Sequence, residues 1–135
     1  MKTVISAIAI VALSTSAWAE DLSDSDKILC SINTVQLCLE VGECFRVPPA
    51  ELDIPHFIVV DTKSKTLSTT KSSGLNRSTP ASNYVRANGR IVLQGVQNAR
   101  AFSISIEEDI GVMTGAVARD GIAVAVFGAC TDSQI

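Results

Sequence analysis

Apolar and polar residues alternate along short segments of this chain, and turn residues separate the segments. In residues 100–106, Phe102, Ile104 and Ile106 share one face, and small or polar residues fill the other. A period of two residues is that of a β-strand with one buried face. After residue 19 no segment has the 3.6-residue period of an amphipathic helix, so the pattern predicts an all-β fold.

Turn residues place the expected strands in hairpin order. Asn88-Gly89 is typical of a two-residue hairpin turn, and Asp120-Gly121 marks another. Strands are predicted over 28–39, 44–47, 57–61, 66–70, 83–86, 91–96, 100–106, 112–118 and 122–130. Residues 71–82 have the composition of a loop. These eight or nine strands predict an antiparallel meander curled into a closed or nearly closed barrel, which removes exposed edges; a two-sheet sandwich is the alternative.

The predicted hairpin 112–130 is apolar on both faces. Branched residues occupy one face of its second strand, and the other face carries Ala123, Ala125, Phe127 and Ala129. A strand that is apolar on both faces is normally covered on both sides. Three covers for the small-residue face remain open: the N-terminal segment, a second copy of the protein, or a ligand in the barrel interior.

The first 19 residues have the pattern of a secretory signal peptide. Lys2 precedes an apolar run over 4–13, and Ala17-Trp18-Ala19 is a small-x-small cleavage site. The apolar run has about ten residues, half of the roughly 20 that a membrane-spanning helix needs. We therefore expect cleavage after Ala19, a protein of the periplasm or a secreted one, and no membrane span after signal removal.

Removal of the signal would leave 116 of the 135 residues, enough for one domain. We expect an acidic, disordered lead-in over 20–27, a single β domain over 28–131 and a tail over 132–135. Loss of Lys2 from the 11 basic residues gives a net charge of −4 against 14 acidic ones. This balance argues against nucleic-acid binding, which requires a concentrated basic face.

Four cysteines, Cys30, Cys38, Cys44 and Cys130, predict a disulfide framework, as is usual for an exported chain with an even number of cysteines. If 28–39 is one continuous strand, Cys30 and Cys38 lie roughly 26 Å apart at ~3.3 Å per residue, too far to bond. In a hairpin centred near Val41, Cys38 lies opposite Cys44. The predicted pairs are therefore Cys38–Cys44 and Cys30–Cys130, and a Cys30–Cys44 pair would contradict that hairpin.

Two further stretches are distinctive: 91–98 (IVLQGVQN) with Arg100-Ala101-Phe102 after it, and the closing 126–131 (VFGACT). With Cys44 and the segment around Pro55, they resemble a group of small exported proteobacterial proteins of unknown function that end in Phe-Gly-Ala-Cys. The resemblance extends over about 30–131, and Phe102 stands where that group tends to have tryptophan. It implies a periplasmic, disulfide-containing domain and no particular activity.

Candidate catalytic and metal-binding groups are few. His56 is the single histidine, and no carboxylate or second histidine stands at ligand spacing from it, so we expect a structural role. Asp61 is expected to cap a turn. The three carboxylates at 107–109 are expected to form a solvated turn, with a weak cation site as the alternative. We therefore expect no catalytic residues, no metal and no cofactor.

The segment 63–77 is the one basic region of this acidic chain. It contains Lys63, Lys65, Lys71 and Arg77 and no acidic residue. Long loops on a rigid barrel often carry binding, although a mobile solvated loop is the alternative. We expect an exported, non-catalytic binding module of the cell envelope, whose partner is an unknown protein or a small apolar ligand. The alternatives are a structural protein that self-associates as a homodimer through hairpin 112–130 and, less favoured, an enzyme.

Overall fold

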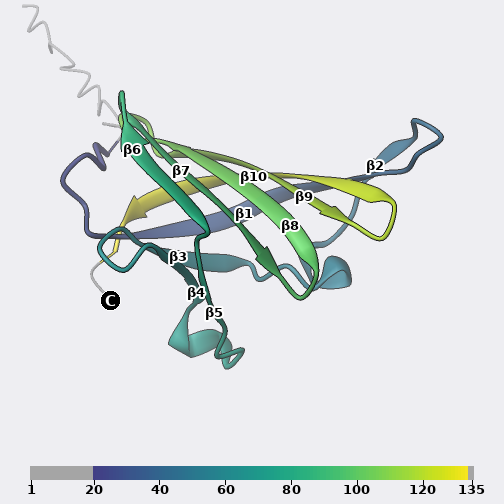
Figure 1. Cartoon of the computed structure of the whole chain (residues 1–135), viewed down its shortest axis with the longest axis horizontal. Coiled ribbons are helices and arrows are strands. Elements are labelled where there is room, and N and C mark those ends of the chain that lie inside the picture. Colours follow the sequence, from purple (N-terminus) through teal and green to yellow (C-terminus); the bar gives the residue numbers. More distant parts are fainter. Residues whose placement is uncertain (1–19, 134–135) are drawn as a thin grey trace, which may run out of the picture.

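The computed structural model describes residues 20–133, which form ten strands and two short 3-10 helices (Figure 1). The strands are β1 (Lys27–Cys38), β2 (Cys44–Arg46), β3 (Phe57–Asp61), β4 (Thr66–Thr69), β5 (Ser78–Pro80), β6 (Asn83–Ala87), β7 (Arg90–Gln97), β8 (Arg100–Glu107), β9 (Val112–Arg119) and β10 (Ile122–Asp132). The 3-10 helices are η1 (Pro49–Leu52) and η2 (Lys71–Ser73). The predicted signal peptide lies outside the described residues. Within them, no helix has the length and apolar character needed to cross a bilayer.

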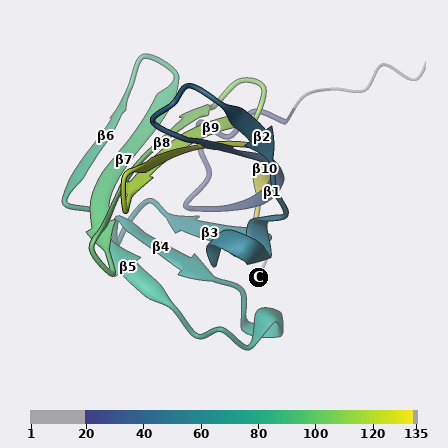
Figure 2. The ribbon, with the colours of Figure 1, turned by 90° about the vertical axis from the view of Figure 1, so that its right-hand side faces the viewer.

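All ten strands belong to one antiparallel sheet, so the predicted all-β meander is confirmed and the two-sheet sandwich is not formed. Nine strands follow the order β5-β4-β3-β1-β10-β9-β8-β7-β6, and β2 pairs with β1 beside this path. The sheet curls until β3, β4 and β5 lie across the interior from β8 and β9 (Figure 2). The result is a half-barrel, because β5 and β6 end the strand order and do not pair with each other.

The open edge at β5 is short and poor in hydrogen-bond donors. β5 has three residues, and its last residue is Pro80, which has no N–H to donate to another strand. Short edges with proline resist pairing with other chains, so the sheet protects this edge without closing into a barrel.

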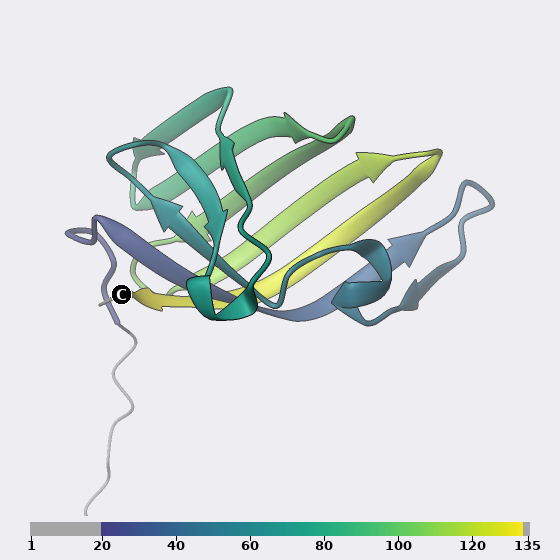
Figure 3. The same cartoon turned by 90° about the horizontal axis from the view of Figure 1, so that it is seen from below.

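β1, with 12 residues the longest of the described strands, crosses the length of the molecule (Figure 3). It pairs with β10 on one edge, and with β3 and β2 on the other. The register places Cys30 opposite Cys130 and Cys38 opposite Cys44, and both predicted disulfides are present. The second disulfide joins the last residue of β1 to the first residue of β2, directly before the loop of the hairpin that projects at one end of the molecule (Figure 1).

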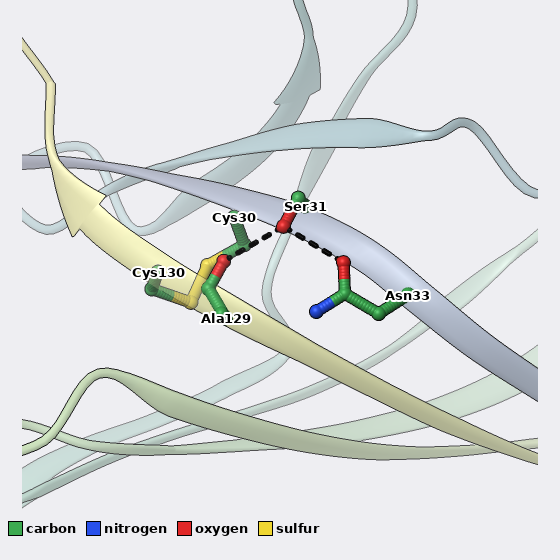
Figure 4. The surroundings of a disulfide bond; sticks show 5 residues. All are labelled: Cys30, Ser31, Asn33, Ala129 and Cys130. Atoms are coloured by element: carbon green, nitrogen blue, oxygen red, sulfur yellow. Dashed lines mark hydrogen bonds between the residues drawn. A yellow bond between two sulfur atoms is a disulfide. The ribbon is translucent and has the colours of Figure 1, made fainter.

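A β-bulge interrupts β1 between Ile32 and Thr34. The Ser31 hydroxyl lies 3.0 Å from Asn33 Oδ1 and 3.3 Å from the Ala129 carbonyl oxygen, next to the Cys30–Cys130 disulfide (Figure 4). Residues three apart in a regular strand point to opposite faces, but the bulge adds one residue, so Ile32 and Val35 both face the core.

The core lies on the concave side of the curled sheet. Its fully buried side chains are Leu22, Ile28, Cys30, Val60, Ile91, Leu93 and Ile106. Alternating residues of β7, β8 and β10 reach this side, as the period-two pattern predicted.

The lead-in over 20–27, which we expected to be disordered, packs against the sheet instead. Leu22 is fully buried, and its N–H donates to the Glu108 carbonyl at 2.8 Å. The Arg86 guanidinium donates to the carbonyls of Leu22 at 2.9 Å and Ser23 at 2.7 Å, and to the Glu108 carboxylate at 3.0 Å. Leu22 is a single apolar residue among acidic neighbours and gives no periodic pattern, so the sequence did not predict this contact.

The small-residue face of hairpin 112–130 lies on the convex side and is exposed. Phe127 keeps 45% of its surface exposed and Val112 keeps 43%. The lead-in contacts β10 at Thr131, through the Glu20 carboxylate, and other bonds of the lead-in go to Arg86, Glu108 and Thr62. A ligand in the interior would touch the opposite face of the hairpin.

Candidate functional site

An apolar cavity of 130 Å³ lies inside the half-barrel. β3 and β4 supply one wall, and β8, β9 and β10 supply the other. Its apolar lining includes Ile58, Leu67, Phe102, Ile104, Met113, Val117, Val124 and Val126. The volume is close to that of a ~150 Å³ cavity that holds one benzene ring, and below the ~300 Å³ at which pockets for drug-sized ligands begin. The cavity therefore suits one ring or a chain of about six carbons.

Three arginines line the rim of this cavity, and we call Arg77, Arg100 and Arg119 the arginine cluster. Arg100 begins β8, Arg119 ends β9, and Arg77 directly precedes β5. The register that pairs Ala101 with Ala118 puts Arg100 and Arg119 across from each other at the same edge. All three are mostly buried, with side chains 23–27% exposed.

The arginine cluster converges on the end of η1. Arg77 donates to the Asp53 carbonyl at 3.1 Å and to its Oδ1 at 2.5 Å, while Arg100 Nη2 lies 3.7 Å from Asp53 Oδ2. Arg100 and Arg119 each donate to the Leu52 carbonyl at 3.4 Å. The hydrogen bond from Arg77, together with the charges of the other two arginines, lowers the pKa of Asp53.

Positive charge exceeds negative charge at this rim. Three guanidinium groups face two carboxylates, Asp53 and the largely exposed Asp120, whose Oδ2 accepts from Arg119 Nε at 3.2 Å. The two bonds to the Leu52 carbonyl are longer than the usual 2.7–3.2 Å for N–H···O, so Arg100 and Arg119 keep donor capacity for a better acceptor. The rim can hold an anion beside an apolar group.

The four basic residues predicted from 63–77 do not form one site. Lys63 Nζ lies 3.0 Å from Asp26, and Lys65 Nζ lies 5.5 Å from the centre of the Tyr84 ring. Lys71 begins η2 and, with Arg77, lines a separate polar depression beside it. Of the four, Arg77 alone reaches the cavity. The acidic partners of Lys63 and Arg77 are Asp26 and Asp53, which lie outside this segment of the sequence.

Sequence reasoning missed Arg100 and Arg119. Each stands beside a turn, where a charged residue usually indicates exposure to solvent. A signal was present, because a hairpin that pairs Glu107 with Val112 brings Arg100 opposite Arg119. Two arginines in that relation carry like charges across a strand pair, which destabilises a sheet unless an anion lies nearby.

Asp61 and His56, two other candidate groups, lie outside the lining of the cavity. Asp61 Oδ1 accepts the N–H groups of Ser64 and Lys63 at 3.0 Å each, so the predicted turn cap is formed and the pKa of Asp61 is lowered. His56 is exposed, and its carbonyl accepts the Ile32 N–H at 2.7 Å.

The three carboxylates at 107–109 go to different surroundings rather than to one solvated turn. Glu108 is 5% exposed and pairs with Arg86, whereas Glu107 pairs with Arg90 at 2.7 Å and Asp109 is exposed. No cluster of three or more metal-ligating side chains occurs among residues 20–133.

Comparison with protein-family models, curated proteins and solved structures found no match for this chain. The function is therefore argued from the geometry of the cavity and its rim.

Proposed function

We propose that this protein is an exported, non-catalytic binding module of the cell envelope that takes a small apolar group into its half-barrel. The observation that carries the proposal is the apolar cavity between β3–β4 and β8–β10. An apolar group that enters this space would exchange contact with water for contact with the apolar side chains of both walls. Such burial stabilises the bound state by about 25 cal/mol per Å² of apolar surface removed from water.

Two further observations support the other parts of the proposal. The disulfides Cys30–Cys130 and Cys38–Cys44 are typical of an oxidising compartment such as the periplasm or the cell exterior. Of the two carboxylates at the rim, Asp53 accepts from Arg77 and Asp120 accepts from Arg119, while Asp61 caps a turn. These engaged carboxylates favour binding over acid–base catalysis.

A titration of the oxidised, isotope-labelled protein with hexanol, followed by NMR, tests this function. We expect shifts at cavity residues such as Ile104, Met113 and Val126. Val117→Phe should fill the cavity and abolish them, and Val112→Phe, on the convex face of the same strand, should leave them intact. Hexanol shifts that are absent from the cavity at millimolar concentration, or equal in the two variants, would contradict the proposal.

The exposed convex face of hairpin 112–130 favours self-association as a second candidate function. Contiguous exposed apolar surface is typical of interaction sites. Phe127→Asp should shift the protein to a lower mass in sedimentation analysis. Phe45→Asp is the matched control, because Phe45 is equally exposed, at 46%, but lies on the concave side of the sheet. Phe45 pairs with Leu37 and Leu37 pairs with Val124, which is buried on that side. A monomeric wild-type protein at high concentration excludes this candidate.

A further inference from the structure

We propose that the cavity and the arginine cluster form one site for a small carboxylic acid. The apolar part of the acid, one ring or a chain of about six carbons, occupies the cavity, and its carboxylate binds Arg100 and Arg119. This inference rests on the proposed function, because it assigns the charge of the ligand whose apolar part fills the half-barrel.

Strand geometry connects the two parts of the site. Phe102 and Val117 pair across β8 and β9 and line the cavity. Arg100 and Arg119 stand two residues further along the same strands, so their side chains leave the sheet on the same concave face. Two residues of a strand span about 6.7 Å, which is within the length of a six-carbon acid.

The charges at the rim favour an anion. Arg100 and Arg119 lie across from each other, and the one carboxylate near Arg100 is Asp53, which Arg77 already holds at 2.5 Å. The guanidinium fork matches a carboxylate through two parallel hydrogen bonds, which a neutral carbonyl cannot accept as well. A ligand carboxylate would therefore replace the two 3.4 Å bonds to the Leu52 carbonyl.

Asp53 shows that a carboxylate fits against these arginines. It follows η1 with φ 56° and ψ 34°, a left-handed conformation that aspartate tolerates better than most residues. That conformation directs its carboxylate to Arg77 and Arg100. Asp53 is thus an internal competitor for part of the site, and its replacement should strengthen binding of an acid.

Hexanoate and hexanol test the assignment, because they share an apolar chain and differ in charge. We expect the wild-type protein, at pH 7 and low salt, to bind hexanoate at least tenfold more tightly than hexanol in NMR titrations. The double variant Arg100→Gln/Arg119→Gln should lose about tenfold or more in affinity for hexanoate and change its affinity for hexanol less than twofold. Asp53→Asn should strengthen hexanoate binding, and Arg90→Gln, on the convex face, should change neither.

The outcomes separate this inference from the function on which it rests. Equal binding of hexanoate and hexanol, or equal weakening of both in the double variant, would show that the arginines only fasten η1 to the sheet. In that case the carboxylate assignment fails and the proposed cavity function stands. Shifts from neither ligand would overturn both. If the double variant does not fold, the hexanoate-to-hexanol ratio and its decrease with added salt in the wild-type protein decide the matter.

Discussion

Removal of the Cys30–Cys130 disulfide should destabilise the protein more than removal of the Cys38–Cys44 disulfide. The first bridge closes a sequence separation of 100 residues and the second one of 6. In the chain-entropy model these loops correspond to about 4.7 and about 2.4 kcal/mol at 25 °C. Cys30 is also fully buried, whereas Cys44 is exposed, so the longer bridge adds a packing loss in its alanine variant. We expect a difference of at least about 2 kcal/mol in unfolding free energy.

Urea unfolding of Cys30→Ala/Cys130→Ala and Cys38→Ala/Cys44→Ala, with the wild-type protein beside them, measures this difference. Far-UV circular dichroism is the appropriate signal, because Trp18 is the single tryptophan and precedes the predicted cleavage site. The slope of the unfolding free energy against urea should be compared first, since a changed slope means a changed unfolded state. Equal losses, or a greater loss from the short bridge, would refute the reasoning from loop length.

Three further predictions concern stability. Gly128→Ala should reduce the unfolding free energy by about 1–3 kcal/mol, because the added Cβ would collide with the Ser31 carbonyl oxygen beside the β1 bulge. Gly115→Ala should cost less, because a Cβ there meets its nearest neighbours at 3.5 Å. Urea midpoints of the two variants measure the difference. Glu108→Ala should reduce the unfolding free energy by about 3 kcal/mol, because it leaves Arg86 without its buried partner. Glu107→Ala removes a more exposed ion pair and should reduce it by less than about 1 kcal/mol. Similar losses for the two variants in thermal unfolding would contradict this prediction. A hydrogen bond from Arg77 lowers the pKa of Asp53 in the folded state, and one from the Ser64 N–H lowers the pKa of Asp61. Both carboxylates therefore stabilise the fold at pH values above the unfolded-state pKa of about 3.9, and this stabilisation is lost as the pH falls below that pKa. Urea midpoints from pH 7 to pH 2.5 should therefore decrease below about pH 4, and Asp61→Asn should reduce the decrease.

Local patterns predicted most of the fold because the strands carry their own period. Residues 100–106 alternate as β8 does, and Asn88-Gly89 forms the β6–β7 turn. The disulfides followed from the length of one strand. β5 was missed because Ser-Thr-Pro has the composition of a loop and becomes a strand only through its pairing with β4.

The candidate site was harder to predict because it depends on contacts between distant segments. The apolar lining follows from alternation, but the volume left between two walls of a curled sheet depends on how far the sheet curls. Arg77 was noted for its basic neighbours, yet its partner, Asp53, directly follows η1 and lies 24 residues away in sequence. Arg100 and Arg119 acquire a role only when η1 lies over the end of β8 and β9.

The pairing of β1 with β10 also determines the order in which the fold can form. β6 to β10 each pair with a neighbour in sequence, so they can assemble as local hairpins. β1 can pair early with β2 and β3, but its pairing with β10 must wait for a strand that follows it by more than 80 residues of sequence. Cys30 is therefore available to Cys38 and Cys44 before β10 is in place, so early oxidation can join it to either of them, although the short native loop Cys38–Cys44 competes with such pairs. Disulfide exchange must correct such pairs. Maturation should accordingly be faster in the presence of a disulfide isomerase, and it ends only when the two distant strands meet.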